Sequence, residues 1–270
     1  MDRVSGGAAA LAVVVGLVGT CAGCGGSGAA AEDRKGVDPG RAVRGAADAV
    51  LRAGSADAVR TGMEMAAGGT RVTIRGTGVY DFRRSRGQLE VLLPTGPAGK
   101  QEHRPIIEVF VPGALFMKNR GAGVPADKWV RIDTAALADG NLVTGGATDP
   151  LAAVELLRGA REVAFVGQGA DGVRRYRGVA DLALASKAAS PQVRGPLGAA
   201  AKGFSTKGVP FEAYLDGAGR VRKVRHEFSF VNAGKTVAVA STVTFDGFGK
   251  PVRVVTPPAG DIYTGKIRRQ

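Results

Sequence analysis

The chain has 270 residues and a formal net charge of +13; 44% of its residues are hydrophobic and 23% are charged. That length suffices for one large domain or two small ones, and this hydrophobic fraction excludes a wholly disordered chain. With two cysteines and two histidines, a zinc ribbon, an iron–sulfur cluster and a disulfide scaffold are excluded.

The N-terminus has the features of an export signal. Residues 8–19 form an apolar run that is shorter than the ~20 residues needed to span a bilayer and has the length of a signal-peptide core. The sequence CAGC at residues 21–24 then resembles a bacterial lipobox, although Cys21 stands where leucine is usual. We therefore predict a lipoprotein signal peptide over residues 1–23 and lipidation, as with palmitate, at Cys24, which matches better than Cys21. The alternative is an ordinary secreted protein with an incidental cysteine.

Three further segments follow the signal peptide. Residues 24–36 are rich in glycine and alanine, which predicts a flexible tether. Residues 37–258 are predicted to form a single domain, and residues 259–270 a C-terminal tail.

Three stretches of the body have the signals of amphipathic helices. An aspartate followed by proline, a favoured N-cap and first helical residue, stands at residues 38–39 and at residues 149–150. The first of these helices has apolar residues at spacings of three and four as far as Gly54. A third helix is predicted from Asp181 to the residue before Pro191.

Nearly all of the remaining sequence alternates between apolar and polar residues, which is typical of strands with one buried face. We therefore predict an α+β fold in which a strongly curved antiparallel sheet, a half-barrel of about ten strands, wraps a few helices. A closed barrel and a sandwich are the alternatives. The predicted strands cover residues 72–82, 89–93, 107–111, 115–117, 129–132, 163–166, 173–179, 211–215, 224–230 and 236–245.

The predicted helices are rich in alanine, whereas the strands carry valine, leucine, isoleucine and phenylalanine. Small side chains opposite a curved sheet leave apolar space, and a lipid tail would fill such a space. The candidates for lining this cavity are Val91, Val109, Phe116, Trp129, Leu156, Leu157, Phe211, Leu215, Phe228, Phe230 and Val239.

Several segments, taken in order, resemble one lipoprotein family. They are GTGVYDF at 76–82, DKWV at 127–130, DPL at 149–151, RYRGVAD at 175–181, FEAYLDGAGR at 211–220 and VTFDGFGKP at 243–251. Together with Cys24 they are similar to the LppX/LprA/LprF/LprG lipoproteins and, more distantly, to the LolA/LolB carriers. This resemblance implies a curved sheet around helices, with an apolar cavity that binds acylated lipids or glycolipids. It transfers no individual ligand-contacting residue.

Other motifs point away from catalysis. Residues 167–172 have the letters of a dinucleotide-binding loop, but a strand follows where that motif requires a helix, so we predict a hairpin loop. His226 is predicted to be a hydrogen-bonded histidine of the core or of the cavity rim. Because the sequence has no nucleophile elbow and no metal-ligand spacing, we expect no enzymatic activity, cofactor or metal.

The net positive charge raises the question of an anionic partner. The basic residues are not interleaved with aromatic residues as in proteins that stack bases, so nucleic acid is not expected. Anionic head groups of a membrane are the preferred partner, since each nearby Lys or Arg contributes ~1 kcal/mol. A solvated basic surface without a partner is the alternative.

The sequence thus predicts a lipid-anchored lipoprotein on the outer face of the cell membrane. It would bind an acylated lipid or glycolipid in an apolar cavity between sheet and helices, for lipid transport or presentation. The alternative is an interaction or sensor module of the cell envelope that has the same fold and an interior filled by side chains.

Overall fold

The computed structural model describes residues 38–67, 69–94, 104–144, 147–204, 206–232 and 234–265. These residues contain eleven strands, four α-helices and three short 3₁₀ helices. No helix among them has the length and apolar character to cross a membrane. The predicted signal peptide, Cys24 and the tether lie outside the described residues.

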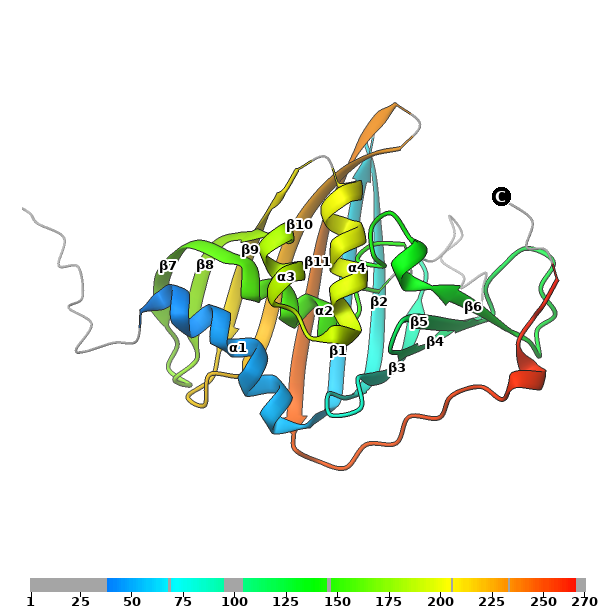
Figure 1. The fold of residues 1–270 in the computed structure, drawn as a ribbon, viewed down its shortest axis with the longest axis horizontal. Coiled ribbons are helices and arrows are strands. Elements are labelled where there is room, and N and C mark those ends of the chain that lie inside the picture. The colour runs from blue at the N-terminus through cyan, green and yellow to red at the C-terminus, as the bar shows by residue number, and fades with distance from the viewer. Residues whose placement is uncertain are drawn as a thin grey trace, which may run out of the picture. The chain divides into compact units, whose positions relative to one another are not determined.

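All eleven strands belong to one antiparallel sheet (Figure 1). The first six strands pair in sequence order, and so do the last five. The last strand pairs with the first at the centre of the sheet, which leaves the sixth and seventh strands at opposite edges. In spatial order the strands are β6 (Trp129–Asp133), β5 (Ala114–Lys118), β4 (Ile106–Val111), β3 (Arg86–Leu92), β2 (Thr70–Asp81), β1 (Ser55–Ala67), β11 (Lys235–Phe248), β10 (Val221–Asn232), β9 (Gly208–Leu215), β8 (Arg174–Asp181) and β7 (Ala160–Gln168).

Three of the four α-helices begin where the sequence predicts a helix to start. The Asp38 carboxylate accepts a hydrogen bond from the Arg41 N–H at 2.7 Å, and Gly54, with φ of +87°, ends the first helix. Asp149 and Asp181 cap two further helices in the same way. The helical segments are α1 (Pro39–Ala53), η1 (Thr134–Ala136), α2 (Pro150–Glu155), η2 (Leu156–Gly159), α3 (Leu182–Ala188), α4 (Pro191–Gly203) and η3 (Ala259–Asp261).

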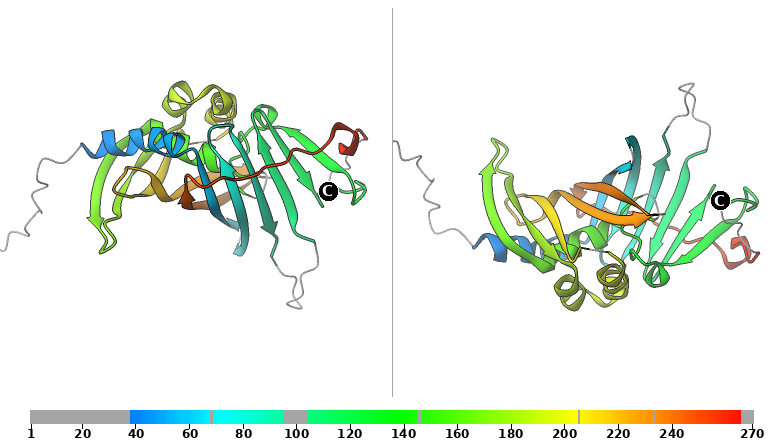
Figure 2. Two further views of the ribbon diagram at one scale, coloured as in Figure 1. Left: turned by 90° about the horizontal axis from the view of Figure 1, so that it is seen from below. Right: turned by 90° about the horizontal axis from the view of Figure 1, so that it is seen from above.

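The α-helices lie on one face of the sheet, which we call the inner face (Figure 2). One large cluster of buried apolar side chains fills the space between this face and the helices. Irregular pairing in β1, β7 and β10 interrupts the regular register, and such bulges bend strands and increase their twist. The predicted α+β fold, a curved antiparallel sheet with helices on one side, is confirmed.

The C-terminal segment covers part of the other face, the outer face. Val254 and Ile262 pack there against a small apolar cluster formed by Val109, Ala114 and Phe116. The segment then reaches the edge strand β6, where the Tyr263 N–H donates to the carbonyl oxygen of Trp129 at 2.8 Å. Residues 254–263 thus protect one edge of the sheet from pairing with other strands.

Two elements are absent from the sequence prediction. The stretch that forms α4 contains Pro196 and several glycines, which are poor helix formers. The stretch that forms β1 is rich in alanine and lacks clear alternation. Both elements owe their conformation to tertiary contacts, since α4 packs on α3 and β1 is paired on both sides.

Candidate functional site

A cleft of about 590 Å³ lies on the inner face, between α4, the loop at residues 138–144 and strands β1, β2 and β10. We call it the inner cleft. Its apolar walls come from elements far apart in the sequence, which the sheet order brings together. The residues that line it are Met65, Ile74, Arg120, Ala138, Asp139, Val143, Thr144, Lys202, Gly203, Phe204 and Phe230.

The position of α4 defines one wall of the inner cleft. Phe204, at the end of α4, stacks on Phe228 of β10 with ring centroids 5.3 Å apart. The helix also approaches the loop closely, because a Cβ at Gly203 would overlap the Ala138 carbonyl oxygen and a Cβ at Gly140 would overlap the Pro196 carbonyl oxygen. The two glycines therefore allow α4 and the loop to meet backbone to backbone.

The rim of the inner cleft is charged. The Asp139 carboxylate is engaged within the loop, where it accepts backbone N–H groups of Asn141, Val143 and Thr144 at 3.1, 2.8 and 2.7 Å. Arg120 and Lys202 are solvent-exposed. Neither makes a hydrogen bond or ion pair with another described residue.

Beside the inner cleft, the inner face carries a buried polar row. The hydroxyls of Thr148 and Ser241 share a hydrogen bond, and Thr148 also donates to the Leu142 carbonyl oxygen at 2.8 Å. His226 lies opposite Ser241 in the β10–β11 register. Burial lowers the pKa of His226 to about 3, so the imidazole is neutral at physiological pH. As predicted, His226 is a core residue, but its Nε2 atom has no hydrogen-bond partner among the described residues.

Glu108 is the most unfavourably placed acid of the inner face. It is fully buried on β4, opposite Leu89 and Met117 in the register, and neither carboxyl oxygen has a partner among the described residues. Burial raises the pKa of Glu108 to about 8, although the positive charge of Arg120 opposes this shift. At neutral pH the Glu108 carboxyl group is therefore mostly protonated.

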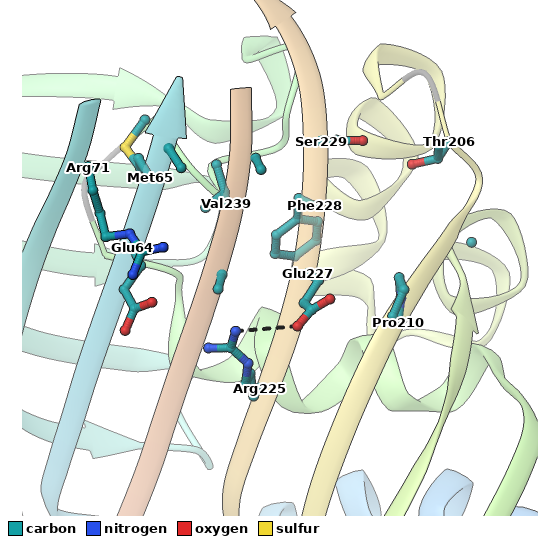
Figure 3. Close-up of a pocket in the computed structure, with 14 residues that line it drawn as sticks. Glu64, Met65, Arg71, Thr206, Pro210, Arg225, Glu227, Phe228, Ser229 and Val239 are labelled. Carbon is teal, nitrogen blue, oxygen red and sulfur yellow. Dashed lines mark hydrogen bonds and ion pairs between the residues drawn. The ribbon is translucent and has the colours of Figure 1, made fainter. Parts of the chain in front are cut away.

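The outer face has grooves of a different character. One, of about 490 Å³, is lined by charged side chains that include Glu64, Arg71, Arg225 and Glu227 (Figure 3). In that view the strands stand in front of the helices, and Arg225 pairs with Glu227 at 3.3 Å. Other cations of this face are paired too, such as Arg175 with Glu212 at 2.6 Å. The same groove also exposes apolar atoms of Met65, Phe228 and Val239, so charged and apolar side chains share its lining.

The candidate lining residues fall into three environments. Phe230 lines the inner cleft. Val109, Phe116 and Trp129 belong to the outer-face cluster beneath the C-terminal segment. The remaining candidates belong to the core cluster of the inner face, and they are Val91, Leu156, Leu157, Phe211, Leu215, Phe228 and Val239. Of these, Phe228 and Val239 also line the groove of Figure 3, and Phe211 lines a second groove of about 380 Å³.

Sequence reasoning missed most of the inner cleft. Met65 lies in β1 and Phe204 at the end of α4, the two elements that were not predicted, and Val143 lies in a loop. One signal in the sequence is that Lys202 and Phe204 follow a run of small residues. This pattern alone does not show that both residues line a cleft with β2.

The structure bears on two questions from the sequence, the glycine-rich loop at residues 167–172 and the metal ligands. Residues 169–173 form the turn of the β7–β8 hairpin, where the Gly169 N–H donates to the Val173 carbonyl oxygen at 2.9 Å. This confirms the hairpin interpretation of the glycine-rich loop. Among the described residues, no three His, Cys, Asp or Glu side chains lie close enough together to hold a metal ion.

No protein-family model matches the sequence, and no curated protein matches it either. Among solved structures, the chain is similar to LprF from Mycobacterium bovis, with 13% identity and a TM-score of 0.38 over 81% of this chain and 96% of that one. It is also similar to a DUF1329 family protein from Desulfovibrio piger, with 10% identity and a TM-score of 0.32 over 81% and 96% of the two chains. LprF is a member of the family that the sequence resembles.

Proposed function

We propose that the chain is an exported lipoprotein that takes the acyl chain of a lipid or glycolipid into the inner cleft, for transport or presentation. The observation that supports this function is an apolar cleft of about 590 Å³, within the ~300–1,000 Å³ range of small-molecule sites, with charged groups confined to its rim. The proposal requires no cofactor and no bond-breaking step.

The source of the lipid determines what the inner cleft must supply. Transfer of an acyl chain from water gains ~0.8 kcal/mol per methylene, but transfer from a bilayer gains almost nothing because the chain is already in hydrocarbon. Selective binding must therefore come from the shape of the cleft and from the polar groups at its rim.

The proposal is tested with a fluorescent fatty-acid probe titrated into the purified full chain. Val143→Trp, inside the inner cleft, and Thr144→Trp, at its exposed rim, should fill the space and reduce probe affinity at least about tenfold, the ratio that ~1.4 kcal/mol represents. Ala240→Trp, in the outer groove, is the matched control and should bind normally. Absence of binding to the wild type would refute the proposal and favour the interaction-module alternative. Equal binding by all variants would refute the inner cleft as the lipid site.

We also propose that Cys24 carries the lipid anchor that holds the protein at the outer face of the cell membrane. Two or three acyl chains on one cysteine hold a protein durably, whereas a single chain does so only marginally. Cys24→Ala should release the protein from the membrane fraction into the medium, while Cys21→Ala should leave it bound. Retention of Cys24→Ala at the membrane contradicts the anchor.

A further inference from the structure

The rim of the inner cleft has an excess of positive charge that the protein itself does not use. Arg120 follows β5 and Lys202 lies in the last turn of α4, and both line the cleft. Each is exposed and makes no hydrogen bond or ion pair with another described residue. Their two charges therefore remain available to a ligand that enters between them.

The one acid at the rim is already occupied. Asp139 directs its two carboxyl oxygens at three backbone N–H groups of its own loop, and these partly neutralise its charge. It consequently holds the loop in place instead of pairing with Arg120 or Lys202. The rim thus favours an anionic group over a neutral or cationic one.

The size of the inner cleft limits the apolar part of the ligand. Its volume of about 590 Å³ lies in the middle of the ~300–1,000 Å³ range for sites that hold one drug-sized molecule. Aromatic side chains at Phe204 and Phe230 narrow it. One acyl chain matches this space, whereas the two or three chains of a membrane lipid exceed it.

From these observations, and resting on the proposed function, we infer that the preferred ligand is a single-chain anionic amphiphile. Its acyl chain lies along Met65, Ile74 and Phe230, and its carboxylate or phosphate group lies between Arg120 and Lys202. Fatty acids and lysophospholipids share this chemistry.

The experiment is a competition series against the fluorescent probe, with competitors below their micelle concentrations. Palmitate and lysophosphatidylglycerol supply the two anionic groups. Monopalmitoylglycerol is the neutral single-chain competitor, and dipalmitoylphosphatidylglycerol the anionic two-chain one. The anionic single-chain ligands should compete about tenfold better than the neutral one, as expected for charge-assisted contacts worth ~1.4 kcal/mol, and they should also exceed the two-chain lipid. Preference for palmitate or for the lysophospholipid identifies the head group.

The matched variants assign this preference to the rim. The double variant Arg120→Gln/Lys202→Gln should lose the anionic preference and keep its affinity for monopalmitoylglycerol. Arg75→Gln/Lys187→Gln, which removes two exposed cations away from the inner cleft, should keep the preference. If neutral and anionic ligands compete equally in the wild type, or if the two-chain lipid competes best, the inference fails while the proposed function stands. If no single-chain or two-chain ligand competes, the proposed function itself fails.

Discussion

The inner face contains two regions with similar apolar side chains and different outcomes. Where α1, α2 and η2 cover the sheet, the apolar side chains of the interface are fully buried, as at Val43 of α1 and at Leu156 and Leu157 of η2. Beneath α4, Met65 and Phe230 remain partly accessible along the inner cleft. The two regions differ in the covering helix: α1 buries the small residues Ala46 and Ala47 against its neighbours, whereas the end of α4 approaches the loop at residues 138–144 backbone to backbone.

The comparison shows that alanine in a covering helix does not by itself create a cavity. An alanine stripe lets a helix approach more closely, and dense packing then restores the contacts. The inner cleft lies where a glycine-mediated contact holds the end of α4 against the loop at residues 138–144.

The largest expected effect is a dependence of stability on pH caused by Glu108, which is buried outside the inner cleft. Its pKa is raised from 4.5 to about 8 in the folded state, so the folded protein retains a proton that the unfolded chain loses. Stability should therefore be greatest below pH ~4.5 for this group and should fall as pH rises to about 8, by at most about 5 kcal/mol at ~1.4 kcal/mol per pKa unit. Burial also raises the pKa of Asp149, to about 6, so Glu108→Gln should remove the part of the decline that lies between about pH 6 and pH 8, measured by urea denaturation at several pH values.

The exposed acid Glu90, on the neighbouring strand β3, provides the control for that series. Glu90→Gln should retain the wild-type dependence of stability on pH. A decline that persists unchanged in Glu108→Gln would show that the Glu108 carboxyl group is not sealed from water.

The next effect tests the packed region directly. Leu156 is fully buried, so Leu156→Ala should lower the free energy of unfolding by about 2–5 kcal/mol without weakening binding of the fatty-acid probe. The exposed Leu184 on α3 is the control, and Leu184→Ala should change stability by less than about 0.5 kcal/mol. A cost below about 1 kcal/mol for Leu156→Ala would mean that this region is as loosely filled as the inner cleft.

A smaller effect is expected where α4 meets the loop. Gly203→Ala places a methyl group against the Ala138 carbonyl oxygen and should cost about 1–3 kcal/mol while also shifting the wall of the inner cleft and weakening probe binding. At Gly195, in the same helix, an added Cβ meets only Ala135 at an ordinary 3.5 Å. Because Gly195 precedes Pro196, whose ring crowds a Cβ on the preceding helical residue, Gly195→Ala should gain little from helix propensity and change stability by less than about 1 kcal/mol. Equal effects at both glycines would contradict the close contact.

The smallest expected effect on stability is at Phe230, on the wall of the inner cleft. Because its side chain is only half-buried, Phe230→Ala should cost about 1 kcal/mol of stability yet reduce probe affinity clearly. Phe165→Ala, at an exposed phenylalanine of β7, should leave probe affinity unchanged. A large loss of stability with normal binding would place Phe230 in the packed region.

The sequence predicts those elements whose signals come from residues close together in the chain. The aspartate–proline caps announce α1 and α2 because capping is a contact within a few residues. Alternation likewise locates the strands that bury one face. By contrast, β1 and α4 depend on partners distant in the chain, so their alanine, glycine and proline residues mislead a local interpretation.

The same dependence on distant contacts explains why the sequence predicts only one of the residues that line the inner cleft, Phe230. Alternation shows that Val109 and Val91 lie on buried faces, but it does not show that Val109 faces the C-terminal segment and Val91 the helices. The charges of Arg120 and Lys202 are visible in the sequence, whereas their convergence on one cleft requires the fold.

The most direct measurement of the central claim is a methyl NMR spectrum of the full chain with a spin-labelled fatty acid bound. An acyl chain in the inner cleft should broaden the methyl signals of Ile74 and Val143 and leave the signal of Val109, on the opposite face, sharp. Broadening at Val109 and Ala240 instead, or no selective broadening at all, would contradict the assignment of the inner cleft as the lipid site.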